Sequence, residues 1–268
     1  MAKASKYVAK IPDRDGIIRY SDEENAVWQE LITRQKAMIK NRACDEYLDA
    51  LDRLDLPEDR VPQCADISRV LRECTGWEVA PVPALINFDK FFQLLADKKF
   101  PAASFIRSRE ELDYLQEPDI FHEIFGHTPL LTDPRFAAFT HAYGKAGLAA
   151  SKEDRVMLAR LYWFTVEFGL IQRRGEELRT YGAGIVSSIG EMPYALDSNE
   201  PERRVFDPVD ALRTPYRIDI YQTVYFIIES FDELYSLAQR DLMSLIKEAR
   251  RLGMHAPTYP PQEERKSA

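Results

Sequence analysis

The chain has 268 residues, of which 45% are hydrophobic and 30% are charged, so it can bury a large core and is too apolar for intrinsic disorder. Its 36 basic and 44 acidic residues give a formal net charge of −8, which disfavours non-specific binding to nucleic acid or to a membrane surface. No apolar run approaches the roughly 20 residues that span a bilayer, and the first ten residues do not resemble a secretory signal.

Helical periodicity dominates the first half of the chain. Ser21 and Glu24 match a capping box, in which each side chain accepts a hydrogen bond from the backbone of the other residue. Apolar residues then recur every three or four positions as far as Ile39, which predicts a first helix. Further helices are predicted over residues 44–54, 67–74 (ended by Gly76), 89–96 and 135–149.

The second half of the chain contains two longer apolar segments. Ser151 can cap a helix that is predicted over residues 156–172 and that Gly175 ends. Residues 231–252 are amphipathic at the helical period and predict a final helix.

Strand-like sequence is confined to two stretches. Residues 217–228 are rich in β-branched and aromatic side chains, and residues 181–188 are predicted to be a loop or a short strand. We therefore expect a mainly α fold with minor short β. No repeat or Gly/Ser linker divides the chain, so we expect a single domain over residues 1–268, with residues 1–20 as an N-terminal extension and 253–268 as a flexible tail.

The cysteines indicate the compartment. Cys44, Cys64 and Cys74 are odd in number, scattered, and not arranged as a C-x-x-C pair. This pattern favours reduced thiols over a disulfide framework or a zinc cage. It predicts a cytoplasmic protein.

The segment from Glu117 to His127 carries two imidazoles and three carboxylates. Imidazole is a good ligand for iron, zinc or copper. His122 and His127 are five positions apart, one more than in a zinc-protease H-E-x-x-H motif. On an ideal α-helix this spacing rotates the second ring by about 140°, so the rings converge only if the helix distorts or ends near Gly126. The alternative is two histidines that pack in an apolar helix and bond to carbonyl groups.

One carboxylate interrupts the apolar segment 156–172. An ionised carboxylate buried there costs several kcal/mol unless a cation compensates it. Glu167 could pair with Arg155 or Arg160, or it could complete the two-histidine, one-carboxylate triad of non-haem Fe(II) oxygenases. The same ligands could hold catalytic zinc, so ligand type leaves the metal open.

Two further patterns are weaker. The glycines in residues 181–188 permit a close backbone approach, but Ser187 stands where a dinucleotide fingerprint needs its third glycine, and an ordinary turn explains them equally well. Arg107 follows two apolar residues and fits either a clamp for a substrate carboxylate or a solvent-facing salt bridge.

Three motifs, at residues 122–130, 162–169 and 181–184, closely resemble the aromatic amino acid hydroxylases, and the likeness runs from about Arg42 to Phe231. It is strongest for the short bacterial members that consist of the catalytic domain alone. The resemblance implies the family's single-domain catalytic fold, a mononuclear Fe(II), a tetrahydropterin cosubstrate and O2. It also implies a monooxygenase that hydroxylates L-phenylalanine to L-tyrosine.

The resemblance further implies three groups of site residues. The catalytic metal ligands are His122, His127 and Glu167. The substrate-binding residues are Arg107 and Ser187, for the carboxylate, and Trp163, for the ring. The cofactor-binding residues are Phe91, which stacks on the pterin, and Glu123 and Tyr162, which lie near the iron.

The choice of substrate rests on an apolar pocket. Trp163 matches the phenylalanine and tyrosine hydroxylases, and residues 225–228 are apolar in a region where tyrosine hydroxylases carry an acidic residue. Phenylalanine is expected, because a buried phenol would need a polar partner. Tyrosine or tryptophan hydroxylation, a zinc hydrolase with Glu123 as general base, and a non-catalytic interaction module are the alternatives. We expect small-molecule partners, no nucleic acid or membrane, and a monomer or small homo-oligomer.

Overall fold

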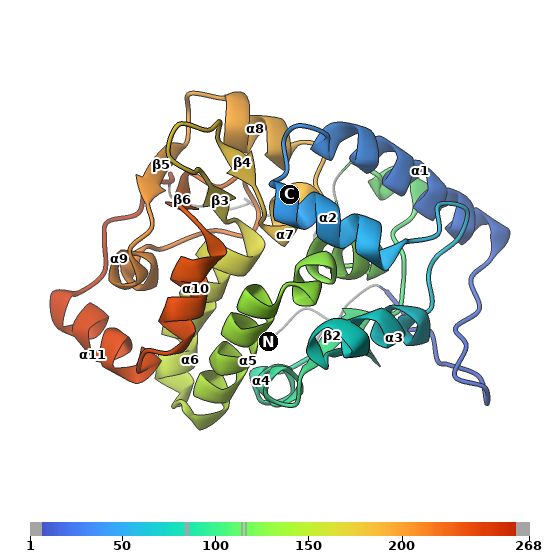
Figure 1. Ribbon diagram of the computed structural model, residues 1–268, viewed down its shortest axis with the longest axis horizontal. Coiled ribbons are helices and arrows are strands. Elements are labelled where there is room, and N and C mark those ends of the chain that lie inside the picture. Colours follow the sequence, from blue (N-terminus) through green and yellow to red (C-terminus); the bar gives the residue numbers. More distant parts are fainter. Residues whose placement is uncertain (1–6, 84–85, 114, 116, 261–268) are drawn as a thin grey trace, which may run out of the picture.

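The computed structural model describes residues 7–83, 86–113, 115 and 117–260. Helices form most of this part of the chain, which confirms the mainly α fold (Figure 1). The α-helices are α1 (Asp22–Ile39), α2 (Asp45–Leu54), α3 (Cys64–Thr75), α4 (Phe88–Ala96), α5 (Pro134–Ala149), α6 (Lys152–Tyr162), α7 (Ala183–Val186), α8 (Glu191–Asp197), α9 (Pro208–Arg213), α10 (Phe231–Ala238) and α11 (Leu242–Leu252). Between them lie the 3-10 turns η1 (Arg109–Glu111) and η3 (Pro129–Thr132) and the π-helices η2 (His122–His127) and η4 (Trp163–Glu167).

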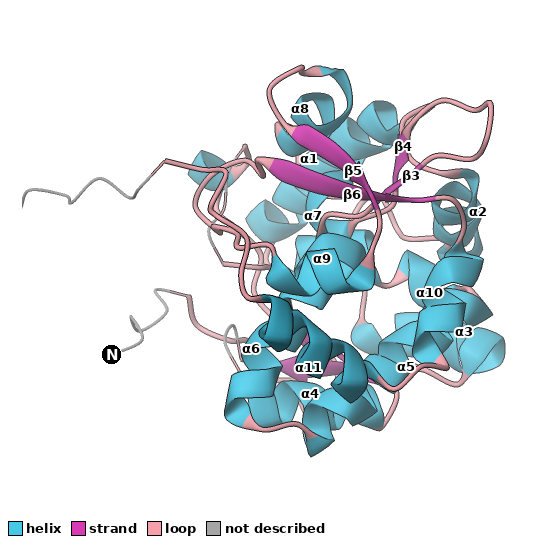
Figure 2. Ribbon diagram, turned by 90° about the vertical axis from the view of Figure 1, so that its left-hand side faces the viewer, coloured by secondary structure: helices cyan, strands magenta, loops and turns pink. Residues whose placement is uncertain are grey.

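Short strands form two sheets in the described part of the chain. Strands β1 (Glu78–Val82) and β2 (Lys99–Ala103) pair in parallel. The larger sheet has the order β4-β3-β6-β5 and consists of β3 (Leu170–Ile171), β4 (Arg179–Thr180), β5 (Glu202–Val205) and β6 (Val224–Ile228). In this sheet β4 runs antiparallel to β3, whereas β3 and β5 run parallel to β6. Figure 2 shows the larger sheet at one end of the molecule and α4 and α11 at the other.

Local capping sets several helix ends where the sequence predicts them. The Ser21 N–H donates to Glu24 Oε2 at 2.7 Å and the Glu24 N–H donates to Ser21 Oγ at 3.3 Å, which is the predicted capping box. Gly76 ends α3 with φ of 77°, a left-handed conformation that glycine adopts without steric cost. Ser151 Oγ accepts from the Asp154 N–H at the start of α6.

Two predicted helices are shorter than expected. The helix predicted over residues 156–172 ends at Glu167, because Leu170 then pairs with Ile227 of β6 as a strand. The helix predicted over residues 231–252 is divided into α10 and α11. Asp241 caps the second of these helices by accepting from the Met243 N–H. The first break depends on a partner that lies elsewhere in the fold, whereas the second coincides with a local cap.

Helix α5 lies between α4 and α10 and packs closely on both (Figure 1). Gly144 and Gly147 of α5 permit this contact with α4, since a Cβ on Gly144 would lie 2.6 Å from Leu95 Cβ and a Cβ on Gly147 would lie 2.0 Å from the Phe92 ring. One hydrophobic core extends from α1 to α11 and includes the motif that carries the two histidines. The histidine motif is therefore held inside the main core.

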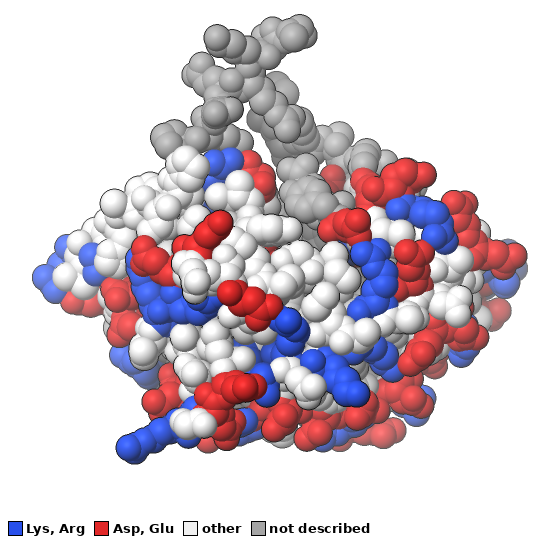
Figure 3. All heavy atoms as spheres, turned by 90° about the horizontal axis from the view of Figure 1, so that it is seen from above, with Lys and Arg blue, Asp and Glu red and all other residues white. Residues whose placement is uncertain are grey.

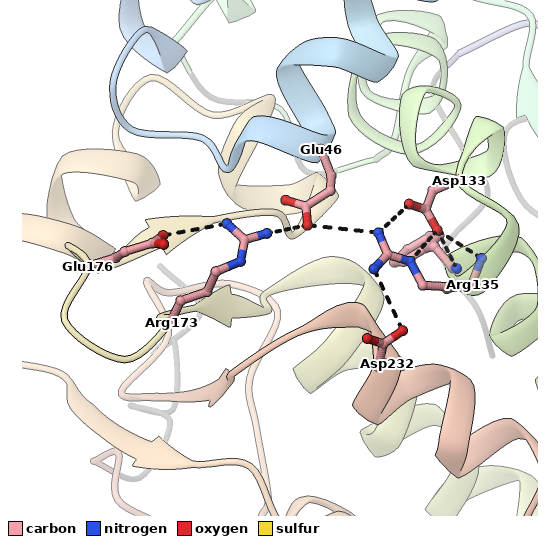
Figure 4. A network of polar contacts seen from close by, with 7 residues as sticks. Glu46, Asp133, Arg135, Arg173, Glu176 and Asp232 are labelled. Atoms are coloured by element: carbon pink, nitrogen blue, oxygen red, sulfur yellow. Dashed lines mark hydrogen bonds and ion pairs between the residues drawn. The ribbon is translucent and has the colours of Figure 1, made fainter.

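An ion-pair network fixes α2, α5 and α10 to the segment after β3 (Figure 4). Arg135 Nη2 lies 2.8 Å from Asp133 Oδ2 and 3.8 Å from Glu46 Oε1, and its Nη1 lies 3.6 Å from Asp232 Oδ1. Arg173 also pairs with Glu46, so one carboxylate of α2 joins two guanidinium groups. Because the pairs are connected and partly buried, we expect them to stabilise the fold more than isolated surface pairs do.

The predicted extension and tail are described in part. The Ile18 N–H donates to Gln63 Oε1 at 2.9 Å, and Arg213 Nε donates to Gly253 O at 2.6 Å. Residues 1–6 and 261–268 lie outside the described residues, and the flexibility of the tail stays a prediction.

Charged side chains of both signs lie on the surface of the molecule. Figure 3 shows Lys and Arg interspersed with Asp and Glu over one face. Among the described residues, no helix has both the length and the apolarity to cross a membrane.

Candidate active site

The histidine motif forms the π-helix η2 instead of an α-helix. In a π-helix the backbone hydrogen bonds join residues five apart, so His122 and His127 come to the same face. The predicted distortion near Gly126 is therefore a widening of the whole turn. A second π-helix, η4, continues α6 and ends at Glu167. Single π-turns inside helices occur frequently at functional sites.

The three predicted metal ligands converge. His127 Nε2 lies 3.1 Å from His122 Nε2 and 3.0 Å from Glu167 Oε1, and His122 Nε2 lies 3.6 Å from Glu167 Oε2. His127 is buried and its Nδ1 has no hydrogen-bond partner among the described residues. Two nitrogens and one carboxylate that face a common point fit a divalent transition metal, because the two-histidine, one-carboxylate set is typical of non-haem Fe(II).

Ser187 fixes the tautomer of His122. Its hydroxyl donates to Ala183 O at 2.7 Å, so its oxygen accepts the hydrogen of His122 Nδ1 at 2.9 Å. The proton on Nδ1 leaves a lone pair on Nε2, the atom that faces His127 and Glu167. A hydrogen bond of this kind orients metal-bound imidazoles in many proteins.

Burial and nearby charges shift the pKa values of the ionisable groups in the site in different directions. Burial lowers the pKa of His122 to about 4, so this imidazole is neutral near pH 7. Burial raises the pKa of Glu167, but His127 and His122 lower it by more, and the carboxylate is ionised. Burial also raises the pKa of Glu123 well above its usual range, and the charge of Glu167 adds to this shift.

Glu123 lies near enough to be considered as a ligand. One potential ligand atom from each of His122, Glu123 and His127 lies within 4.8 Å of the others. The distances to Glu167 are shorter, and the high pKa of Glu123 favours a protonated acid there. The geometry therefore favours Glu167 as the third ligand and leaves Glu123 beside the site.

Arg107 is buried against Asp119, a residue that the sequence did not single out. Arg107 Nε donates to Asp119 Oδ2 at 2.8 Å and Nη2 donates to Oδ1 at 2.9 Å. Asp119 also accepts from the backbone N–H of His122 at 3.0 Å, so one carboxylate holds both the arginine and a predicted ligand. The solvent-facing salt bridge is therefore wrong, since Arg107 is 8% exposed and Asp119 0%. The apolar setting of the motif was the signal for such a buried pair.

Arg107 retains donors for a further anion. A guanidinium has five N–H bonds, and Asp119 takes two of them. A third points to Leu112 O at 3.4 Å, which is long for a hydrogen bond. The remaining N–H bonds of Nη1 and Nη2 suit a carboxylate group.

Aromatic side chains line another side of the centre. Tyr162 is buried, and its ring lies 6.2 Å from that of His127 and 5.6 Å from that of Phe91. Phe91 on α4 is half-buried, and Phe100 on β2 packs 4.8 Å from His127. These rings offer an aromatic surface next to the ligands, as expected for a flat cofactor.

Trp163 begins the same π-helix that Glu167 ends. It is partly exposed, and its ring packs 4.3 Å from that of Tyr216 and 4.6 Å from that of Phe168. The indole is therefore held at a fixed place relative to Glu167.

The residues predicted as a loop or short strand contain the helix α7 instead. A Cβ on Gly182 would lie 2.5 Å from Glu167 O and 2.5 Å from Gly169 N, so only glycine fits there. This is the close backbone approach that the glycines indicate. It brings Ser187, at the end of α7, to His122.

Comparisons with known proteins agree with this geometry. A family model described as biopterin-dependent aromatic amino acid hydroxylase matches residues 1–252. The chain is 58% identical over 261 residues to the phenylalanine-4-hydroxylase of Pseudomonas aeruginosa, which covers 97% of this chain and 99% of that protein.

Solved structures show the same architecture. The apo structure of the cold-active phenylalanine hydroxylase from Colwellia psychrerythraea has a TM-score of 0.92 and 56% identity, and the match covers 94% of this chain and 97% of that one. The phenylalanine hydroxylase of Chromobacterium violaceum with bound oxidised Fe(III) has a TM-score of 0.86 and 44% identity, over 92% and 89% of the two chains.

Proposed function

The chain belongs to the biopterin-dependent aromatic amino acid hydroxylases, and from this premise we propose which of its residues carry out the reaction. It is an iron- and tetrahydropterin-dependent monooxygenase that hydroxylates L-phenylalanine to L-tyrosine with molecular oxygen. The zinc hydrolase and the interaction module are excluded by this membership. The small-molecule partners are phenylalanine, the pterin and O2.

We propose that His122, His127 and Glu167 bind the iron. The observation that carries this assignment is the convergence of His122 Nε2, His127 Nε2 and the Glu167 carboxylate, whose closest approaches lie between 3.0 and 3.6 Å. Three protein ligands on one face leave the other coordination positions open. When bound, the iron and the pterin supply the activation of oxygen that side chains alone do not provide.

The substrate residues have separate tasks. Arg107, through its remaining N–H bonds, binds the carboxylate of phenylalanine, while Asp119 keeps its guanidinium in place. The indole of Trp163 bounds the ring of the substrate. An apolar boundary favours phenylalanine over tyrosine, because a buried phenol would be left without a hydrogen-bond partner.

The proposed pterin-binding residues lie on the side of the site that is lined by aromatic rings. Phe91 stacks on the pterin, and the Tyr162 ring supports Phe91 from α6. Burial raises the pKa of Glu123, which favours the protonated acid, and its carboxyl group presents a hydrogen-bond donor or acceptor beside the proposed iron ligands. These apolar surroundings also keep water from the reacting atoms.

Ser187 has two candidate tasks. Its contact with His122 Nδ1 supports a role in orienting a metal ligand, whereas the family resemblance implies contact with the substrate carboxylate. Loss of an orienting contact of this kind typically weakens metal binding about 10–100-fold. Ser187→Ala distinguishes the two, since the first role predicts a weaker Fe(II) affinity and the second a higher KM for phenylalanine at saturating iron.

The experiment that tests the residue roles combines metal loading and kinetics. Wild type, Arg107→Lys and Ser187→Ala are loaded anaerobically with Fe(II), then given phenylalanine, tetrahydropterin and O2, and tyrosine is quantified. Arg107→Lys keeps a positive charge next to Asp119 but loses the planar guanidinium that can bind a carboxylate through two hydrogen bonds. We therefore expect a KM for phenylalanine raised about tenfold or more and an unchanged KM for the pterin. An equal rise in both KM values would contradict the proposed binding of the substrate carboxylate by Arg107.

The cell compartment and assembly state are proposals of the same kind. All three cysteines are free thiols, which is typical of the reducing cytoplasm. A monomer or small homo-oligomer is expected, and light scattering on the purified protein measures it.

A further inference from the structure

The indole N–H of Trp163 has one specific partner. Trp163 Nε1 donates to Gln222 Oε1 at 2.8 Å, and the two residues are 59 positions apart. The indole plane stacks on Tyr216 with an interplanar angle of 15°. Because the hydrogen bond fixes the edge of the indole and the stacking fixes its face, the ring is prevented from tilting or sliding.

Gln222 is itself held firmly. It is 4% exposed, and its Nε2 donates to Arg217 O at 2.9 Å and to Ile220 O at 3.2 Å. These bonds define its amide orientation, so Oε1 faces Trp163. Its backbone N–H donates to Glu191 Oε1 at 3.0 Å, and Glu191 is buried at the start of α8.

Glu191 connects this contact to the larger sheet. The Tyr225 hydroxyl, on β6, donates to the same carboxylate oxygen that accepts from the Gln222 N–H. A series of hydrogen bonds, buried from Tyr225 through Glu191 to Gln222, therefore continues to the partly exposed indole. None of these residues other than Trp163 has a role in the reaction as described above.

We propose that Gln222 is a positioning residue that sets the place of the phenylalanine ring through the indole of Trp163. The inference rests on the proposed role of Trp163 as the boundary of the ring. Hydroxylation at one ring carbon needs that carbon, and not its neighbour, nearest the reacting oxygen. A displacement of about 1 Å is large on this scale and changes rates up to about 100-fold.

The test is the position of hydroxylation. Gln222→Leu removes the acceptor at similar volume, and we expect roughly tenfold more meta-tyrosine relative to para-tyrosine, with less tyrosine formed per pterin oxidised. The KM for phenylalanine should rise while the KM for the pterin is unchanged. Gln35→Leu is the matched control, because Gln35 is a buried glutamine of α1 at 3% exposure and should leave the product ratio unchanged.

A second variant separates positioning from loss of packing. Gln222→Glu keeps an acceptor for Trp163 Nε1 but loses both donations to the loop carbonyls. We expect a product ratio close to wild type even if the thermal midpoint falls. A shift as large as that of Gln222→Leu would overturn the inference, because general loosening of the loop would then explain both.

A double-mutant cycle tests whether Gln222 acts through the indole of Trp163. Trp163→Phe lacks the indole N–H, so adding Gln222→Leu to it should change the product ratio little further. Additive effects would overturn the inference while leaving the role of Trp163 intact. If Trp163→Phe alone changes neither the product ratio nor the KM for phenylalanine, the proposed function of Trp163 fails, and the inference with it.

Discussion

Two glutamates lie beside the same pair of histidines, and their surroundings shift their pKa values in opposite directions. Glu167 contacts both imidazoles, which lower its pKa, whereas Glu123 is half-buried without such a contact and its pKa is raised. An ionised carboxylate is a metal ligand and a protonated acid is a poor one. The proposed choice of Glu167 as the third ligand therefore rests on position and not on residue type.

The contrast between the two glutamates gives a direct prediction. Glu167→Ala should lose stoichiometric iron after anaerobic loading and desalting, because two imidazoles alone hold the metal weakly. Glu123→Ala removes a carboxyl at nearly the same place and should retain about one iron per chain. Iron analysis of both variants is the measurement. Retention of iron by the Glu167 variant together with its loss from the Glu123 variant would reverse the assignment.

At the scale of the element, the site depends on a close contact between the start of α7 and η4, which Gly182 permits. Gly182→Ala would place a Cβ 2.5 Å from Glu167 O, so either α7 or the ligand must move. We expect an iron affinity reduced by at least tenfold, read as the Fe(II) concentration at half-maximal activity. Gly175→Ala is the control, since its Cβ meets nothing within 4 Å and only its positive φ is strained. If Gly182→Ala binds iron as wild type does, the contact is not needed.

Helix α5 carries a pH-dependent cap. Asp133 accepts from the Arg135 N–H at 2.8 Å and pairs with the Arg135 guanidinium. Burial raises the pKa of Asp133, but these contacts lower it by more, so the folded pKa lies below the ordinary value. The ionised cap therefore adds stability above about pH 4, and this stability is lost as the pH falls through the folded pKa.

A substitution at this cap measures the effect. Asp133→Ala should lower the free energy of unfolding by about 1 kcal/mol at pH 7, and the difference from wild type should shrink between pH 5 and 3. Denaturant unfolding across this range is the measurement. Asp133→Asn retains a cap acceptor and should lose less at pH 7. A pH-independent difference for Asp133→Ala would show that the charge contributes nothing.

The elements were predictable where a local signal exists. Ser21, Ser151 and Gly76 mark helix ends through contacts within a few residues, and the sequence alone predicts them. The end of the helix at Glu167 was not predictable, because Leu170 and Ile171 are as apolar as the helix before them and become a strand only by pairing with β6.

The site, like the elements, was predictable only where the sequence carries a local signal. The ligand types and the need for a distorted turn were predicted from His122, His127 and Glu167. The π-helix itself, the Ser187 contact 65 positions from His122, and the Asp119 clamp on Arg107 were not, since each depends on which segments the fold brings together. The family resemblance implies a substrate role for Ser187, which stays a prediction, and the structure adds its contact with His122.

At the scale of the whole molecule, the fold brings distant segments to one point inside the core. The proposed ligands come from η2 and η4, the residues that contact them from α7 and the segment before η2, and the aromatic surface from α4 and α6. The polar side chains are few and most have specific partners, while the surrounding residues are apolar. Under the proposed assignment, this arrangement places the substrate and the cofactor around one metal and keeps water away from both.

The most direct test of this account is the position of the metal. Crystals of the Fe(II)-loaded enzyme, grown without oxygen and measured at the iron absorption edge, give an anomalous difference map. The account predicts one peak bonded to His122 Nε2, His127 Nε2 and a carboxylate oxygen of Glu167. A peak bonded to Glu123 in place of Glu167, or to only one of the histidines, would contradict it.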